Sequence, residues 1–250
     1  MQMTTARRLT VALLLAGVLL FGVGLSYAGG PFGPDEAVMR WMIAHRTVDL
    51  IPVVSTLSDV FGPMMIAIWT MLVAVVLLIR DRNLIRATAL AMCVAIAGIL
   101  TEIVKMVVAR PRPPLQFHIA TPETGFSYPS GHVAGICTLA VACVVVVCTA
   151  STARWIRWCA AVMAAVITLA VAVSRMYLGV HWISDVVAAM AIGVAVPLVI
   201  PELVVAMVTE LDHRRDGRMP RWFKPRSTST NRNPLHALSL IHISEPTRPY

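Results

Sequence analysis

Apolar stretches of about 20 residues recur along this chain of 250 residues, and they constrain its fold more than any other feature. A helix of that length spans the hydrocarbon core of a bilayer, where the backbone must satisfy its own hydrogen bonds. Only 14% of the residues are charged, whereas soluble domains carry about 25%. The sequence therefore predicts an all-α, polytopic helix bundle embedded in a membrane.

We predict six transmembrane helices in one membrane domain, residues 1–210. They cover residues 9–28, 61–79, 86–108, 132–150, 155–174 and 182–208. Pro197 and Pro201 should kink the far end of the last span, because proline removes a helix hydrogen bond and clashes with the preceding turn. Residues 211–250 form a basic tail that we expect to be disordered. Its end, LSLIHISEPTRPY, resembles nothing upstream and reads as non-native, so His236 and His242 receive no role.

The first span has an alternative interpretation. Arg7, Arg8, the apolar run and the small residues of SYAGG also fit a secretory signal peptide with a cleavage site. The run is long for a signal peptide, and the count of six spans requires it. We therefore expect it to stay in the membrane as a helix.

Basic residues predict the orientation of the bundle. They cluster before the first span, between spans two and three, between spans four and five, and after span six: Arg7, Arg8; Arg80, Arg82, Arg86; Arg154, Arg157; Arg214, Arg215, Arg218, Arg221, Lys224, Arg226. Six spans place all four clusters on one side, which the positive-inside rule makes the cytoplasm. Both termini should thus be cytoplasmic in a cell membrane, with loops 29–60, 109–131 and 174–182 outside. This topology accounts for the net charge of +8, and no nucleic-acid motif accompanies it.

Residues 34–46 within the first outer loop predict a short helix. Pro34, Asp35 and Glu36 suit its first turn. Val38, Trp41, Met42 and His45 should share one face, either against the outer leaflet or as a lid packed on the bundle. The five cysteines, Cys93, Cys137, Cys143, Cys148 and Cys159, all lie in apolar runs and should be core residues without disulfides.

Three short segments hold most of the charge that topology leaves unexplained. They are KMVVARPRP (105–113), YPSGH (128–132) and SRMYLGVHWISD (174–185). All three fall at the outer ends of predicted spans, so they can meet in one layer. A charge at the centre of a membrane helix costs about 2.5–3.5 kcal/mol on insertion scales, and ionisable groups kept near a bilayer usually serve a function. We therefore expect a polar site at the outer surface.

This layer has the chemistry of a phosphate site. Lys105, Arg112 and Arg175 are cations, and guanidinium forks match phosphate oxygens. Pro129 and Gly131 shape a tight turn, and Ser130 is a natural N-cap for the fourth span. The free N–H groups there form a ready anion site. Each arginine alone would more simply be a lipid-headgroup anchor. Their combination with a helix N-terminus favours phosphate.

Two histidines and an aspartate complete the set. His181 and Asp185 are four positions apart and share a helical face if the last span begins there. The carboxylate would fix one imidazole nitrogen and leave the other as a nucleophile or base. His132, from another span, could protonate a leaving oxygen. The same three side chains could bind zinc, but the three cations would repel it, so we expect no metal and no other cofactor.

These motifs resemble the type 2 phosphatidic acid phosphatase family, integral-membrane enzymes whose catalytic site is shared with vanadium haloperoxidases. The first motif is Lys105, residues 106–111 and Arg112-Pro113; the second is Pro129-Ser130-Gly131-His132; the third is Ser174-Arg175, residues 176–180, His181, residues 182–184 and Asp185. The resemblance covers about residues 1–210. Arg110-Pro111 offers a competing register whose spacing from Lys105 does not fit the family.

The resemblance implies a mechanism. His181 would attack phosphorus and form a phosphohistidine, Asp185 would orient His181, and His132 would protonate the leaving group and then activate water. Lys105, Arg112, Ser130, Gly131 and Arg175 would hold the phosphoryl oxygens. The substrate would be a lipid phosphate: phosphatidate, phosphatidylglycerophosphate or undecaprenyl diphosphate.

Three other functions are alternatives to lipid phosphatase activity. A phosphotransferase would use the same site with a sugar or lipid hydroxyl in place of water. A transporter or structural protein should carry polar groups at the membrane midplane, yet the nearest one, Glu102, more simply pairs with Lys105. Haloperoxidase activity is disfavoured, because those relatives are typically soluble.

Overall fold

The computed structural model describes residues 4–82, 84–119, 123–151, 153–215 and 220–223. Throughout these ranges the protein is helical, with no β-strand. Six helical units are long and apolar enough to cross a membrane: α1 (Thr5–Ala28), α4 (Pro63–Asp81), α5 (Leu84–Val108), α6 (Gly131–Ala150), α7 (Arg154–Tyr177), and α8 with α9 (Ile183–Arg214). The predicted six-span bundle is therefore confirmed, with boundaries shifted by a few residues.

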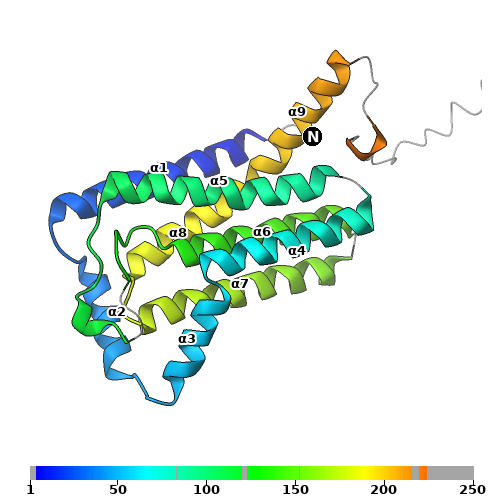
Figure 1. Cartoon of the computed structure of the whole chain (residues 1–250). Coiled ribbons are helices and arrows are strands. Elements are labelled where there is room, and N and C mark those ends of the chain that lie inside the picture. Colours follow the sequence, from blue (N-terminus) through cyan, green and yellow to red (C-terminus); the bar gives the residue numbers. More distant parts are fainter. Residues whose placement is uncertain (1–3, 83, 120–122, 152, 216–219, 224–250) are drawn as a thin grey trace, which may run out of the picture.

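Helix α6 is the centre of the bundle (Figure 1). It packs against α4, α5, α7 and α8, while α1 lies against α5 and α8. Glycines allow two of these contacts to be close. A Cβ atom on Gly193 of α8 would lie 2.5 Å from Cys137 Cβ of α6, and one on Gly135 of α6 would lie 2.7 Å from Ile66 Cδ1 of α4. Membrane helices commonly approach each other through such small residues.

Helix α1 is an integral part of the packing. Its Gly22 faces Tyr128, where an added Cβ atom would lie 2.5 Å from the tyrosine ring. The Tyr128 hydroxyl donates a hydrogen bond of 2.7 Å to the Val18 carbonyl. The first span thus supports the segment that leads into the PSGH motif, as the six-span prediction requires.

The last span is broken, as its prolines predict. Helix α8 (Ile183–Ala195) passes through a 3-10 turn (Val196–Leu198) into α9 (Ile200–Arg214), which diverges from the bundle in Figure 1. Because α9 continues to Arg214, the predicted domain boundary at residue 210 falls inside a helix. The predictions of a disordered tail and a non-native end concern residues that, apart from 220–223, lie outside the described part of the chain.

The first outer segment is more ordered than the predicted loop 29–60. It contains two helices, α2 (Gly33–Ala44), close to the expected 34–46, and α3 (Leu50–Val60), which we did not predict. Helix α2 packs on α7 and α8, which fits the lid alternative. Its buried side chains are Asp35, Met39 and Met42, whereas Trp41 is exposed and stacks on His45, so the predicted apolar face was partly wrong.

The prediction that all five cysteines lie in the core is also partly wrong. All five are free, and Cys93 and Cys137 are buried. Cys148 and Cys159 lie exposed on the outside of their helices, where the apolar surroundings would be lipid. Hydrophobicity alone could not separate these two positions, because a membrane helix is apolar on both its lipid face and its packed face.

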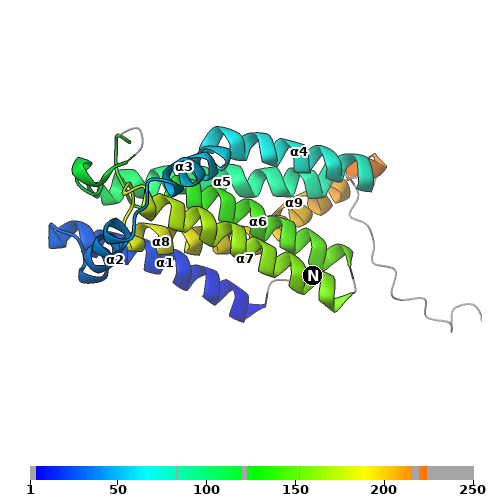
Figure 2. The same ribbon diagram turned by 90° about the horizontal axis from the view of Figure 1, so that it is seen from below.

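Different segments of the chain lie at the two ends of the bundle. Helices α2 and α3 and the segment that precedes α6 gather at one end in both Figure 1 and Figure 2. The α4–α5 and α6–α7 connections, which carry the basic clusters, lie at the opposite end. The three predicted site segments belong to the end that carries α2 and α3.

Candidate active site

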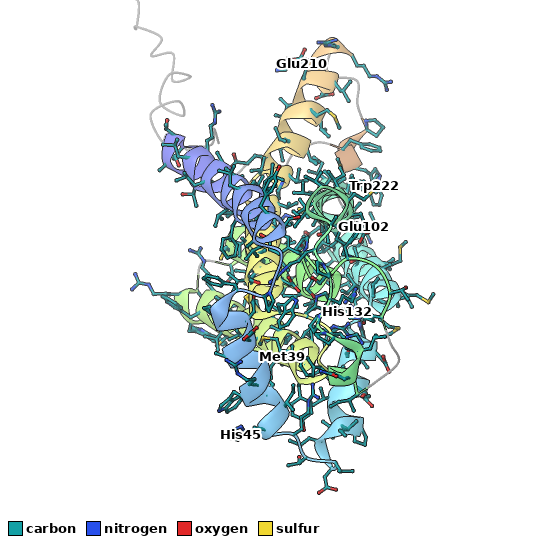
Figure 3. The ribbon with its side chains drawn as sticks, turned by 90° about the vertical axis from the view of Figure 1, so that its left-hand side faces the viewer. Met39, His45, Glu102, His132, Glu210 and Trp222 are labelled. Atoms are coloured by element: carbon teal, nitrogen blue, oxygen red, sulfur yellow. The ribbon has the colours of Figure 1, made fainter. Side chains whose placement is uncertain are left out.

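The three motif segments converge on one cavity. Its volume is about 430 Å³, and it lies between α4, α5 and α6. Five of the eight predicted site residues line it: Lys105, Arg112, Gly131, His132 and His181. Figure 3, which views the bundle from the α2 end, shows His132 near the middle of the helix cluster. The other three, Ser130, Arg175 and Asp185, are buried and do not belong to this lining.

His181 and Asp185 meet, but not on one face of a helix as predicted. Helix α8 begins only at Ile183, so His181 lies in the preceding turn and is 1% exposed. Asp185, in the first turn of α8, reaches back over the helix start. Its Oδ2 accepts a hydrogen bond of 2.9 Å from the Trp182 N–H and lies 3.4 Å from His181 Nδ1.

The other nitrogen of His181 faces the cavity cations. Its Nε2 is 3.2 Å from Arg112 Nη1. Because arginine can only donate, Nε2 must accept and the ring proton must sit on Nδ1, toward Asp185. Burial, and then the charges of Arg175 and Arg112, lower the pKa of His181 well below its usual value. The imidazole is therefore neutral and carries a lone pair on Nε2, the state that nucleophilic attack requires.

Ser130 occupies the N-cap position of α6, as predicted, but its side chain makes no capping hydrogen bond. The hydroxyl is buried without a partner, while the backbone N–H donates to the Asp185 carbonyl at 3.2 Å. A buried polar group without a partner is unusual and points to a ligand or water. Next to it, Lys105 Nζ lies 3.5 Å from the position that a Cβ atom on Gly131 would take, so the ammonium reaches the start of α6.

The three predicted cations contact a carboxylate, a backbone carbonyl and a hydroxyl, respectively. Lys105 Nζ lies 2.8 Å from Glu102 Oε1, which confirms the predicted pairing. Arg112 Nη1 donates to the Val180 carbonyl at 3.0 Å. Arg175, 3% exposed, donates to the hydroxyl of Ser58, a residue of the unpredicted helix α3.

Glu123 is a member of the site that sequence reasoning missed. Its Oε2 lies 2.9 Å from Arg112 Nη1, and its Oε1 accepts a hydrogen bond from Arg175. Burial alone would raise the pKa of Glu123, but the charge of Arg175, and then that of Arg112, lowers it to about 2. An ionised carboxylate is thus held between the two guanidinium groups. The sequence did contain a hint, since Glu123 is the one acidic residue of segment 109–131.

Arg110, the competing register of the first motif, lies elsewhere. Its Nη1 donates to Asp185 Oδ1 and to Ser184 Oγ, both at 2.7 Å, and its Nη2 donates to Asp35 Oδ2 at 2.6 Å. It does not line the cavity, whereas Arg112 does, in agreement with the spacing argument. Arg110 and Asp35 are further neighbours of the site that the sequence did not indicate.

The zinc alternative required a cluster of ligands. Among the residues that the structure describes, no group of three or more His, Cys, Asp or Glu side chains is arranged to hold a metal ion.

Fold and cavity together define a class of protein: a six-span helical membrane protein with basic residues and histidines around one cavity near one end of the bundle. Residues 86–207 match the model of the PAP2 superfamily, the type 2 phosphatidic acid phosphatases. This matched part of the chain, which contains all three motifs, belongs to the PAP2 superfamily, and the resemblance carried by the motifs is confirmed.

Individual relatives agree with this assignment. A protein from Sulfolobus acidocaldarius named undecaprenyl-diphosphatase is 32% identical over 133 residues, which are 50% of this chain and 58% of that protein, so the match spans little more than half of the relative. Among solved structures, a PAP2-type phosphatidylglycerolphosphate phosphatase from Bacillus subtilis superposes with a TM-score of 0.65 at 20% identity, covering 80% of this chain and 98% of the other. Aquifex aeolicus LpxE gives 0.55 at 18% identity, covering 68% and 96%. The two structures show a shared fold.

Proposed function

We propose that this protein is an integral-membrane lipid phosphatase that works through a phosphohistidine and needs no metal ion or other cofactor. Its substrate is a lipid phosphomonoester or diphosphate of the kind represented by phosphatidate, phosphatidylglycerophosphate and undecaprenyl diphosphate. The names of two relatives, an undecaprenyl-diphosphatase and a phosphatidylglycerolphosphate phosphatase, fall within this range.

One observation carries the proposal: the Glu123 carboxylate bridges Arg112 and Arg175 next to His181. A carboxylate held by two guanidinium groups marks a site built for an oxyanion. Three further donors of these residues lack a partner: the Nε atoms of both arginines and the Ser130 hydroxyl are buried without hydrogen bonds. A phosphoryl group that replaced Glu123 would bring more oxygens and more charge to these donors than a carboxylate does.

The walls of the cavity fit a lipid phosphate. The part between α4 and α5 is lined by apolar or small residues: Pro63, Ile66, Ala67, Val94, Ala95 and Gly98. Lys105, Arg112 and the two histidines line the part nearest the end of the bundle. A hydrocarbon chain could therefore lie along the membrane helices while its phosphate meets the cations.

The proposed reaction has two steps. His181 Nε2 attacks phosphorus and forms the phosphohistidine, while the leaving oxygen takes a proton from His132. His132 then accepts a proton from water, which attacks the phosphohistidine, releases phosphate and restores His181. Lys105, Arg112, Arg175, Ser130 and Gly131 stabilise the charge on the phosphoryl oxygens, which is usually the largest catalytic contribution. Such cations can supply the positive charge that magnesium brings elsewhere.

We place the protein in the cell membrane with both termini in the cytoplasm and the site at the outer face. The support is the distribution of basic residues, which lie at the end of the bundle opposite the site. Its partners would then be the bilayer and a lipid phosphate of the outer leaflet, and no nucleic acid.

The test is release of phosphate by purified protein from the three candidate lipids, without an added acceptor. Release would identify a hydrolase, whereas activity that required a sugar or lipid hydroxyl would identify the phosphotransferase alternative. We expect His181→Ala to abolish release while the protein still inserts and folds. Vanadate should inhibit and a chelator should not. Loss of activity with a chelator would contradict metal independence and support the zinc alternative. Wild-type turnover by His181→Ala would show that His181 is not the nucleophile.

A further inference from the structure

Arg110 is a buried cation beside the site, and the reaction described above does not use it. Its side chain is 3% exposed and forms ion pairs with two carboxylates, Asp185 and Asp35, which are both 0% exposed. Its guanidinium also faces the Trp182 ring at 5.7 Å. With Nη1 and Nη2 both bound to protein groups, and no place in the lining of the cavity, Arg110 has a task other than holding phosphate.

The two oxygens of Asp185 show what that task is. Oδ2 accepts a hydrogen bond from the Trp182 N–H and lies next to His181 Nδ1, and Oδ1 accepts a hydrogen bond from Arg110. A buried carboxylate stays ionised only when charges and hydrogen bonds replace the lost water. If Asp185 were protonated or rotated, it would no longer fix the proton of His181 on Nδ1. Arg110 therefore acts on the nucleophile through Asp185.

Asp35 completes the arrangement from a different element. Its Oδ2 accepts from Arg110, and its Oδ1 accepts from both the backbone N–H and the hydroxyl of Ser184, at 3.0 and 2.7 Å. The Ser184 N–H is one of the first-turn donors of α8 that have no partner within the helix. Asp35 thus balances the second half of the guanidinium and fixes the helix turn that carries Asp185.

We propose that Arg110 and Asp35 are positioning residues of the phosphatase reaction, which link the outer helix α2 to the His181–Asp185 pair. This inference rests on the proposed function. It assigns to Asp35 a part in turnover although α2 contributes nothing to the lining of the catalytic cavity.

The variants Arg110→Lys and Asp35→Asn test this proposal. Lysine keeps the charge but loses the fork that reaches two carboxylates, and asparagine keeps the shape but loses the charge. We expect each to lower kcat roughly 10- to 100-fold, as outer-shell partners do at other sites, and to change KM by less than about threefold. Glu36→Gln is the matched control on α2, because Glu36 forms an exposed ion pair with Arg40 and should be replaceable without loss of turnover.

A double-mutant cycle separates positioning from simple structural support. In an Asp185→Asn background, Arg110→Lys should lower kcat by less than about threefold, because the group through which Arg110 acts is already altered. An equal loss in both backgrounds, or wild-type kcat in Arg110→Lys and Asp35→Asn, would overturn the inference. If Asp35→Asn does not accumulate in the membrane, Ser184→Ala takes its place, because it removes the hydroxyl between Asp35 and Arg110. Its kcat relative to that of the wild type is then compared with the same expected decrease.

The wild-type protein separates this proposal from the one on which it rests. A wild-type protein that releases no phosphate from any of the three lipids would overturn the proposed function as well. An active wild type with unaffected variants would overturn only the positioning roles.

Discussion

At the scale of single residues, the role proposed for Asp185 is to decide which nitrogen of His181 can react. Asp185→Asn keeps the shape of the side chain, but its amide can donate to Nδ1 and so favour the tautomer whose lone pair points away from the cavity. We expect kcat to fall about 10³- to 10⁴-fold, as when an orienting aspartate is lost from a catalytic triad, with little change in KM because Asp185 does not line the cavity. Steady-state kinetics of phosphate release measure both constants.

The exposed Asp49 provides the control for that experiment. Asp49→Asn removes the same charge from the surface at the start of α3, and it should leave kcat unchanged. A variant Asp185→Asn with a normal kcat and a raised KM would show that the carboxylate serves binding instead of orientation.

Glu123 should compete with the substrate. The phosphoryl group must displace an ionised carboxylate from Arg112 and Arg175, and hydrogen bonds to charged groups contribute about 1.5–3 kcal/mol each. Glu123→Gln removes that charge, so we expect KM and the inhibition constant of orthophosphate both to fall about tenfold, with kcat retained. The matched control is Glu210→Gln, an exposed glutamate of α9 far from the site (Figure 3). A tenfold rise in KM would instead make Glu123 part of the binding site.

At the scale of elements, the sequence predicted the six spans, whose length the bilayer sets, but not the short helix α3, whose place depends on packing. Six spans could be predicted because length and hydrophobicity are set by the membrane. Helix α3 has 11 residues, too few for a span, so the length argument that identifies the six spans does not identify it. The contact that α3 makes through Ser58 with Arg175 was lost with it.

The site residues divide in the same way. Lys105, Arg112, His132 and His181 could be named because each is out of place in an apolar chain and belongs to a spaced motif. Asp35 could not, because an acidic residue in a first helical turn already has a local explanation. Its partner Arg110 is 75 positions away, and no feature of one sequence joins the two.

Helices α6 and α8, which bear His132 and Asp185, pack closely against each other at Gly193, and we expect this close packing to contribute to stability. A Cβ atom on Gly193 would lie 2.5 Å from Cys137 Cβ and 3.1 Å from the Thr138 backbone nitrogen, atoms that cannot move without their helix. We expect Gly193→Ala to destabilise the fold by about 1–3 kcal/mol, seen as a lower Tm in detergent. Gly17→Ala in α1, where nothing lies within 4 Å, should leave Tm equal or slightly higher. Equal Tm values for both variants would mean that the helices can separate at little cost.

At the scale of the whole molecule, the basic clusters and the site lie at opposite ends of the bundle, and this polarity decides which leaflet supplies the substrate. Positively charged loops remain in the cytoplasm, so the site should face outward. Leu115, 67% exposed near the site, and Trp155, 70% exposed at the start of α7, lie at the two ends. We expect Leu115→Cys to react with a membrane-impermeant maleimide on intact cells and Trp155→Cys to react only after lysis.

This comparison needs a background in which the five native cysteines are replaced by serine or alanine. Cys148 and Cys159 are exposed near the α7 start and would otherwise be labelled themselves. The background protein should release phosphate and take up no label, which shows that the fold survives the replacements. Labelling of Trp155→Cys on intact cells, with Leu115→Cys protected, would show that the bundle has the opposite orientation in the membrane. The substrate would then be a lipid of the cytoplasmic leaflet.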